Sequence, residues 1–358
     1  MKRIVVLGGG FAGLWSAIGA ARRLDEEGIG PDRVRVTLVE RNDFHAIRVR
    51  NYEDDLDATT VPLSTVLDPV GVERIRGEVT AIDADRRIVQ VRREGEEVEL
   101  RYDRLVYALG SRLWRPPIPG LGEHGFDIDT YEGAKRLQAH LRGLAATPVI
   151  GSVMGEEARA VIAEALDALG VKVRTGVRVA AVDSEGVALE DGSRIDASTV
   201  VWCAGMRAHA LGASLPGAKD ELGRIEVDAF MRVRGVPDLF AAGDAARAVL
   251  DGEHASMMSC QHSRPMGRYA GHNAAADLLG RPLLPLRIPW YATVLDLGAW
   301  GAVYTRGWER QVIATRELAK ETKMTINRRR VYPPLNGDRR SLLEAAAPLV
   351  QGPPPVGE

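Results

Sequence analysis

The sequence has few cysteines and no long apolar segment. Its 358 residues include only two cysteines, Cys203 and Cys260, which are far apart and not in a CxxC spacing. A disulfide scaffold and a dithiol redox centre are therefore disfavoured, and a reducing compartment fits. No run reaches the eighteen apolar residues of a membrane-spanning helix, and no apolar leader precedes the first strand pattern. We therefore expect a cytoplasmic protein with neither a signal peptide nor a transmembrane segment.

An excess of charge of one sign is also lacking. The 47 lysines and arginines nearly balance the 49 aspartates and glutamates, which gives no electrostatic reason to expect nucleic acid as a partner. Hydrophobic residues make up 45% and charged residues 27% of the chain, as in ordinary globular proteins, so disordered and fibrous classes are excluded. A chain of this length can form two domains around a sizeable core.

The pattern of apolar residues predicts several regular elements beyond the N-terminal unit. Residues 78–109 have the pattern of a β-meander followed by an apolar strand. Helix patterns cover 131–144, 156–169 and about 261 to 279, and the run 171–175 has a strand pattern.

A glycine motif stands between a strand pattern and a helix pattern near the N-terminus. Gly8, Gly10 and Gly13 match GxGxxG, directly after the apolar run 4–7 and at the start of a helix with one apolar face. In this motif the first glycine permits a tight turn, the second lets the backbone approach a pyrophosphate, and the third allows close packing. The helix N-terminus then attracts the phosphates.

An acid follows at the end of the second strand pattern, residues 34–39. The carboxylate of Glu40 can accept both hydroxyl groups of an adenosine ribose, although it lies somewhat farther along than the usual distance of about 20 residues. A glycine-rich turn that binds nothing is the alternative. Because strand, helix and acid occur in the order that the motif requires, the sequence favours a dinucleotide site.

The choice between NAD and FAD depends on the far end of the chain. The apolar run 238–242 leads into Gly243 and Asp244, after which the pattern loosens into a loop. A carboxylate held at a strand end can bind a ribityl hydroxyl, which NAD lacks. An ordinary aspartate in a turn is the alternative for Asp244 taken alone.

Together these motifs resemble the pyridine-nucleotide-dependent flavin reductase superfamily, in particular its type II NADH dehydrogenase-like branch. The resemblance covers most of the chain and rests on residues 8–13, 107–111, 223–228, 240–244 and 261–273. It implies an α/β fold in which a Rossmann-like FAD-binding domain carries a reduced inserted second domain and a C-terminal extension. The implied boundaries are 1–113 and 223–288 for the FAD-binding domain, 114–222 for the inserted domain, and 289–358 for the extension.

The resemblance also implies FAD as the cofactor and a set of residues that contact it. Val79 would lie near the adenine, Gly110 at the crossing into the second domain, and Met266 and Gly267 at a helix start beside the isoalloxazine ring, where backbone N–H groups stabilise negative charge. The full set is Gly8, Gly10, Phe11, Ala12, Gly13, Glu40, Arg41, Val79, Gly110, Gly243, Asp244, Met266 and Gly267.

One expected part of the family pattern is missing. Such reductases carry a second GxGxxG βαβ unit for NAD(P)H between the two FAD-binding parts. After the proline-rich linker 114–120, the strand pattern near Val149 leads into residues 151–155 without the triple-glycine spacing. Residues 155–173 instead resemble what comes later in the inserted domain. We therefore expect a truncated remnant and regard NAD(P)H as a doubtful cofactor, with a natural deletion, an engineered one and an omitted stretch all left open.

The implied function is a flavin-dependent oxidoreductase that passes electrons to a small acceptor such as a quinone, with the flavin and no assigned side chain carrying the chemistry. An FAD-binding protein without NAD(P)H turnover is the alternative. His45 is a candidate proton donor, with a simple packed residue as the competing interpretation. The histidines in 254–272 do not have the spacing of metal ligands. A homodimer and a peripheral membrane contact through the C-terminus stay open, although the weakly amphipathic segment 342–350 does not favour membrane contact.

Overall fold

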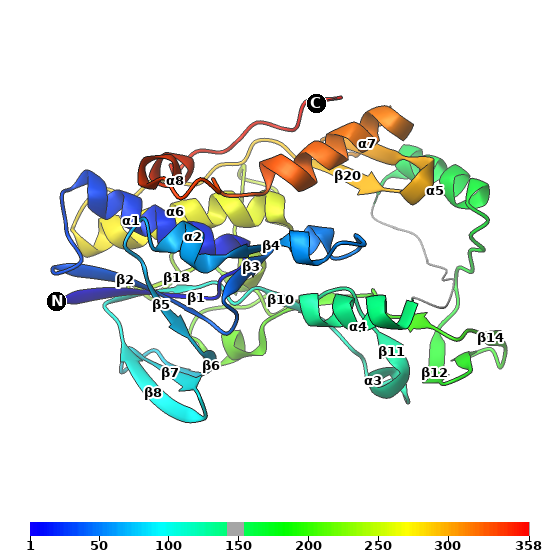
Figure 1. Cartoon of the computed structure of the whole chain (residues 1–358), viewed down its shortest axis with the longest axis horizontal. Helices are drawn as coiled ribbons and strands as arrows, with labels where there is room; N and C mark the ends of the chain where they lie inside the picture. Colours follow the sequence, from blue (N-terminus) through cyan, green and yellow to red (C-terminus); the bar gives the residue numbers. More distant parts are fainter. Residues whose placement is uncertain (142–153, 358) are drawn as a thin grey trace.

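A parallel sheet forms the centre of the protein, which we describe from a computed structural model of residues 1–141 and 154–357. The strand predicted near Val149 and the helix end predicted at 142–144 lie outside these residues. The sheet has five strands in the order β18-β9-β1-β2-β5, so a strand from the last third of the chain completes the N-terminal domain (Figure 1). The strands are β1 (Lys2–Leu7), β2 (Val34–Glu40), β5 (Glu73–Arg76), β9 (Arg104–Tyr107) and β18 (Leu239–Ala241).

Two long helices, α1 (Phe11–Glu26) and α6 (Cys260–Leu278), pack side by side on one face of this sheet (Figure 1). Their backbones approach so closely that a Cβ on Gly267 would lie 2.3 Å from the Ala12 carbonyl oxygen. A Cβ on Gly271 would lie 1.9 Å from the Ser16 carbonyl oxygen. Only glycine fits at these two contacts. The predicted placement of Met266 and Gly267 at a helix start is therefore wrong, because α6 begins at Cys260 and both residues lie buried within it.

The predicted β-meander is confirmed. It comprises β6 (Glu78–Asp83), β7 (Ile88–Arg93) and β8 (Glu96–Arg101), which pair as antiparallel neighbours. Val79 is buried where β6 pairs with β7. In the sequence between β2 and β5 lie β3 (Phe44–Ala46), its antiparallel partner β4 (Thr60–Pro62) and the short helix α2 (Leu63–Leu67).

The middle of the chain forms small, separate sheets instead of one continuous sheet. The predicted helices are present as α4 (Tyr131–Leu141) and α5 (Glu156–Ala168). The predicted strand 171–175 is wrong: these residues belong to no strand, and the nearby Val173 and Val177 are each 39% exposed. A strand needs a neighbour for its backbone hydrogen bonds, and no described residue supplies one here. The other elements are β10 (Ser111–Leu113), α3 (Leu121–His124), β11 (Gly125–Phe126), β12 (Val179–Asp183), β13 (Gly186–Leu189), β14 (Arg194–Asp196), β15 (Val200–Val201) and β16 (Met206–Ala208).

The C-terminal extension is a three-stranded antiparallel sheet covered by α7 (Arg316–Thr325). Helix α5 lies beside this sheet (Figure 1). Its Ile162 and Leu166 form one apolar cluster with Leu297 and Val303. The remaining elements are β17 (Ile225–Glu226), β19 (Ala246–Arg247), β20 (Ala292–Asp296), β21 (Ala302–Arg306), β22 (Gln311–Thr315) and α8 (Arg339–Ala345). Within the described ranges, no helix has the length and apolar character needed to cross a membrane.

Candidate functional site

A cavity of about 530 Å³ opens at the carboxyl ends of the parallel strands. Four strands lead directly into it: residues 9–12 follow β1, residues 40–42 follow or end β2, residues 108–111 follow β9, and Asp244 follows β18. This edge is where open α/β sheets bind their ligands, because the loops at the strand ends diverge there and leave a crevice. The predicted site residues that line the cavity are Gly10, Phe11, Ala12, Glu40, Arg41, Gly110 and Asp244.

The three glycines of the motif have different roles: two allow the turn to close, and the third leaves room for a ligand. Gly8 has a φ of +98°, and a Cβ on Gly13 would lie only 1.7 Å from the Gly8 carbonyl oxygen, so both are needed for the turn to close. Gly10 is different, because a Cβ there would meet no atom within 4 Å. It caps α1, no side chain caps that helix, and its open side faces the cavity. The free N–H groups of the first helical turn are therefore available to an anionic group.

Glu40 closes the end of the cavity beside the glycine loop. One carboxylate oxygen accepts the Gly9 N–H at 2.6 Å, and the other accepts the Asn42 N–H at 3.1 Å. These two bonds fix the carboxylate at the end of β2. Because each oxygen has a second lone pair, the group can still accept hydroxyl donors from a ligand.

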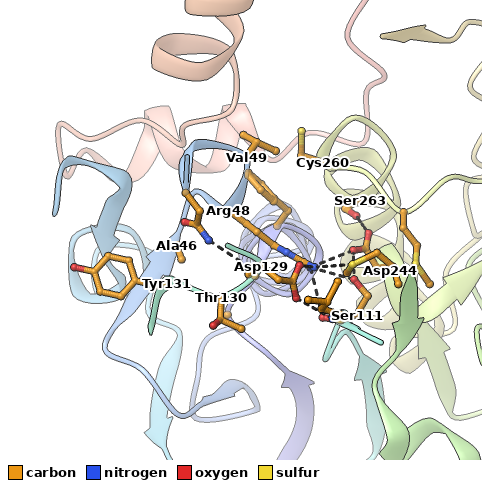
Figure 2. A pocket seen from close by; sticks show the side chains of 18 of the residues that line it. Ala46, Arg48, Val49, Ser111, Asp129, Thr130, Tyr131, Asp244, Cys260 and Ser263 are labelled. Atoms are coloured by element: carbon orange, nitrogen blue, oxygen red, sulfur yellow. Dashed lines mark hydrogen bonds and ion pairs between the residues drawn. The ribbon is translucent and has the colours of Figure 1, made fainter. Parts of the chain in front are cut away.

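Asp244 also lines the cavity, and two serines hold its carboxylate (Figure 2). The Ser111 hydroxyl donates to one carboxylate oxygen at 2.7 Å, and the Ser263 hydroxyl donates to the other at 3.0 Å. These serines come from β10 and α6, so the carboxylate links the two parts of the discontinuous domain. Gly243, with a φ of +72°, supplies the turn that places Asp244 after β18, and a Cβ there would lie only 2.6 Å from the Ala12 Cβ.

His45 lies beneath the glycine loop and does not line the cavity. Its side chain is fully buried, its Nδ1 lies 2.8 Å from the Gly9 carbonyl oxygen, and its ring meets Phe11 edge-on with centroids 4.9 Å apart. Since a carbonyl oxygen only accepts, Nδ1 donates the hydrogen of this bond. The packed interpretation of His45 fits this geometry, whereas a proton donor to a ligand does not.

Burial of histidines makes stability depend on pH. Burial lowers the pKa of His45 to about 4, and it also lowers the pKa of His262 to about 4. The unfolded chain binds protons on these groups below about pH 6.5, while the folded chain does not. The free energy of unfolding should therefore be constant above pH 6.5 and fall between pH 6.5 and 5, by about 1 to 2 kcal/mol for each fully buried histidine.

This dependence can be measured by urea unfolding at several pH values. The variant His45→Asn keeps an N–H group for the Gly9 carbonyl but does not titrate, so its stability should fall less steeply over the same range. An equal slope in the variant and the parent protein would contradict the role given to His45.

Comparison with known proteins identifies the family. The sequence matches the pyridine nucleotide-disulphide oxidoreductase family over residues 2–152 and 143–267. The chain belongs to this family. It is an FAD-dependent oxidoreductase of the NADH dehydrogenase-like kind, and the resemblance stated from its motifs is confirmed.

Several members of the pyridine nucleotide-disulphide oxidoreductase family are similar over nearly the whole chain. An NADH dehydrogenase-like protein of Mycobacterium tuberculosis is 52% identical over 400 residues, covering 98% of this chain and 99% of the relative. A type II NADH:quinone oxidoreductase of Staphylococcus saprophyticus is 24% identical and covers 89% and 96%. The structure of the sulfide:quinone oxidoreductase from Aquifex aeolicus superposes with a TM-score of 0.74 at 18% identity, covering 95% and 92%.

The cavity fits the FAD that this family implies. Two buried polar atoms of lining residues, Asn51 Oδ1 and Ser259 Oγ, have no hydrogen-bond partner among the residues that the structure describes. A buried polar atom without a partner costs free energy, which a polar ligand would recover. The open side of Gly10 and the fixed carboxylates of Glu40 and Asp244 add an anion site and two hydroxyl acceptors.

The sequence did not indicate several residues that line the same cavity. Arg48, Asp129 and Cys203 come from segments that carry no recognised motif, and Cys260 lies at the start of α6. Ser111 belongs to the segment 107–111 on which the resemblance rests. Its position directly after Gly110 was the only feature of the sequence that could have indicated a role in the site. The two free cysteines, remote in sequence, therefore both line one cavity.

Proposed function

We propose that this cavity holds FAD and that the protein passes electrons through the flavin to a small acceptor such as a quinone. The observation that carries the proposal is the convergence of Gly10, Glu40 and Asp244 on one cavity at the carboxyl ends of four strands. FAD supplies the redox chemistry when it is bound, and the protein binds and orients it. The name of the Staphylococcus saprophyticus relative supports a quinone as the acceptor.

Each end of the cavity suits one part of FAD. The free N–H groups at the start of α1 would bind the pyrophosphate, with Gly8 and Gly13 shaping the turn and Phe11, Ala12 and Arg41 adjoining it. Glu40 would accept the ribose hydroxyls, with Val79 near the adenine, and Asp244 after Gly243 would accept a ribityl hydroxyl. The α6 residues that reach the cavity are Cys260 and Ser263, so we move the proposed flavin contact from Met266 and Gly267 to this first turn.

We further propose that the second dinucleotide unit is missing and that NAD(P)H therefore binds weakly. Four observations support this proposal. The alignment with the Mycobacterium tuberculosis relative extends over 400 residues although this chain has 358, and the family match divides into two parts at residues 143–152. Residues 171–175 have a strand pattern but form no strand, and α5 packs on the C-terminal sheet. Both features are expected if a βαβ unit that once lay beside them has been lost.

A second glycine triplet elsewhere does not replace the missing unit. Gly120, Gly122 and Gly125 match the GxGxxG spacing. The first of them follows a proline instead of a strand. Gly120 and Gly125 flank the four-residue helix α3, and Gly122 lies within it. A Cβ on Gly120 would lie 1.7 Å from the Val182 carbonyl oxygen, so this glycine serves packing against β12. Such a turn lacks the strand and long helix that bind a pyrophosphate.

A second candidate function is FAD binding without turnover. It is favoured because a chain that lacks the second dinucleotide unit would have no site for NAD(P)H as the electron donor. The two functions are distinguished by anaerobic reduction of the flavin followed by addition of a soluble quinone. Rapid reoxidation that repeats over many cycles supports the oxidoreductase, while a flavin that binds but does not exchange electrons supports the binding protein.

Replacing Asp244 tests the assignment of the ribityl end. Asp244→Ala removes a charge-assisted acceptor and should weaken FAD binding by about 1.5 to 3 kcal/mol, which is roughly 10-fold to 150-fold in Kd. Titration of the apoprotein with FAD, followed by quenching of flavin fluorescence, measures this change. Asp196→Ala, on the exposed strand β14, is the matched control and should bind FAD as the parent does. Unchanged affinity in Asp244→Ala would refute the assignment.

A further inference from the structure

Arg48 occupies a central position in the cavity that no sequence motif indicated. It begins the single turn Arg48–Arg50 after β3, and its side chain reaches across the cavity (Figure 2). Its guanidinium donates to the Ser111 hydroxyl at 3.0 Å and lies 3.6 Å from an Asp244 carboxylate oxygen. It also forms a short ion pair with Asp129, which precedes α4. One side chain therefore joins the FAD-binding domain to the middle segment.

The charges around this end of the cavity are unequal. The lining carboxylates there are Asp129, Glu132 and Asp244, and the side chains of Asp129 and Asp244 are only 12% and 16% exposed. Among the described lining residues, the other cation is Arg41, which follows Glu40 in the sequence. Arg48 is thus the cation that balances the acidic end. Among the described lining residues, no other cation pairs with the Asp129 or Asp244 carboxylate, so without Arg48 these two charges would lie uncompensated beside a bound group that gained negative charge.

We propose that Arg48 is the counter-charge for the reduced flavin and that Asp129 limits the strength of that charge. The proposal rests on the proposed function, since it requires FAD in this cavity. Asp244 at the ribityl chain would place the flavin ring within reach of the Arg48 guanidinium. A flavin that takes two electrons and one proton gains one negative charge, while the donor loses two electrons. A fixed cation beside the ring favours that product and so raises the reduction potential.

The contacts of Arg48 predict opposite effects for two substitutions. Arg48→Gln removes the cation and should disfavour the reduced flavin about tenfold, which lowers the midpoint potential of a two-electron couple by about 30 mV. Asp129→Asn frees Arg48 from its ion pair and should raise the potential. Asparagine can still accept the Leu113 N–H that Asp129 accepts at 3.0 Å, so the local backbone bond is retained. Arg48→Lys keeps the positive charge and should stay close to the parent potential.

The experiment is equilibration of each FAD-loaded protein with a reference dye during slow anaerobic reduction. The control is Arg194→Gln on the exposed strand β14, which removes a cation that does not line the cavity and should leave both FAD binding and the potential unchanged. A purely structural role for Arg48 would shift affinity in Arg48→Gln and Asp129→Asn alike and leave both potentials unchanged.

Each outcome decides between the alternatives. Potentials that move in opposite directions support the proposal. An unchanged potential in Arg48→Gln, or a shift of the same sign in Asp129→Asn, overturns it. If Arg48→Gln does not fold or retain FAD, the sign of the Asp129→Asn shift decides alone. If the parent protein binds no FAD, the proposed function itself fails, and this inference fails with it.

Discussion

Gly10→Val should leave the protein folded and abolish its retention of FAD. The backbone at Gly10 has φ −71° and ψ −172°, an extended conformation that valine adopts readily. A Cβ there meets no protein atom within 4 Å, so the new side chain would cause no clash inside the fold. It would instead occupy the space in front of the α1 N-terminus, where the pyrophosphate must approach the backbone.

We expect FAD affinity to fall at least about 100-fold, equivalent to about 3 kcal/mol. Flavin content after purification, the Kd from fluorescence quenching, and the thermal unfolding temperature of the apoprotein measure the two effects separately. Normal flavin content in the variant would show that the glycine loop is only a structural turn.

Gly13→Ala is the informative control, because it should affect the stability of the fold first, whereas Gly10→Val should affect FAD binding alone. A Cβ on Gly13 would lie 1.7 Å from the Gly8 carbonyl oxygen, which is backbone and cannot move aside. The substitution should therefore lower the stability of the apoprotein before any effect on the ligand appears. A stable Gly13→Ala protein would contradict the packing role of this glycine.

The local parts of the fold were predictable because each depends on short-range chemistry. The apolar run 4–7 forms a fully buried parallel strand, and α6 begins within one residue of its predicted start. The glycine motif prescribes its own geometry, since only glycine tolerates the φ of Gly8 and the contact at Gly13.

The failures have a common physical origin in long-range contacts. The alternation of valine with basic residues in 171–175 is a strand pattern, but a strand forms only when a partner is adjacent. We placed Met266 and Gly267 at a helix start because the resemblance implied that their backbone adjoins a flavin. In the sequence alone, a glycine that approaches a flavin cannot be distinguished from a glycine that lets two helices pack closely. In the structure, Gly267 accommodates the Ala12 carbonyl.

The candidate site was predictable only where a motif marks it. Arg48, Asp129 and Ser111 belong to three separate segments and meet because β3, β10 and the start of α4 converge on one cavity. Their side-chain types are common in loops, so no single position indicated a role. Only the folded arrangement shows that one guanidinium joins two carboxylates.

Reduction of the flavin by NADH or NADPH should be slow and should not saturate below about 1 mM, the upper end of usual KM values. A nicotinamide dinucleotide needs a helix N-terminus for its pyrophosphate and a polar group for its ribose. Residues 154–205 present neither group in a GxGxxG arrangement: α5 begins after Gly155 with no strand before it in the described residues, and its apolar side packs on the C-terminal sheet. Dithionite needs no such site and should still reduce the flavin completely.

An anaerobic stopped-flow titration, which follows flavin absorbance against nucleotide concentration, measures this difference. The matched variant is a chimera that carries, at the junction of the two family matches (143–152), the residues of the Mycobacterium tuberculosis relative that have no counterpart here. If the missing unit is the cause, the inserted βαβ unit should give residues 171–175 a neighbouring strand and should restore saturable reduction by NADH.

Two results would contradict this explanation. Fast, saturable reduction of the parent chain at micromolar NADH would show that the nucleotide binds through residues other than a GxGxxG unit. A chimera that is reduced no faster than the parent would show that the loss of this unit does not limit reduction.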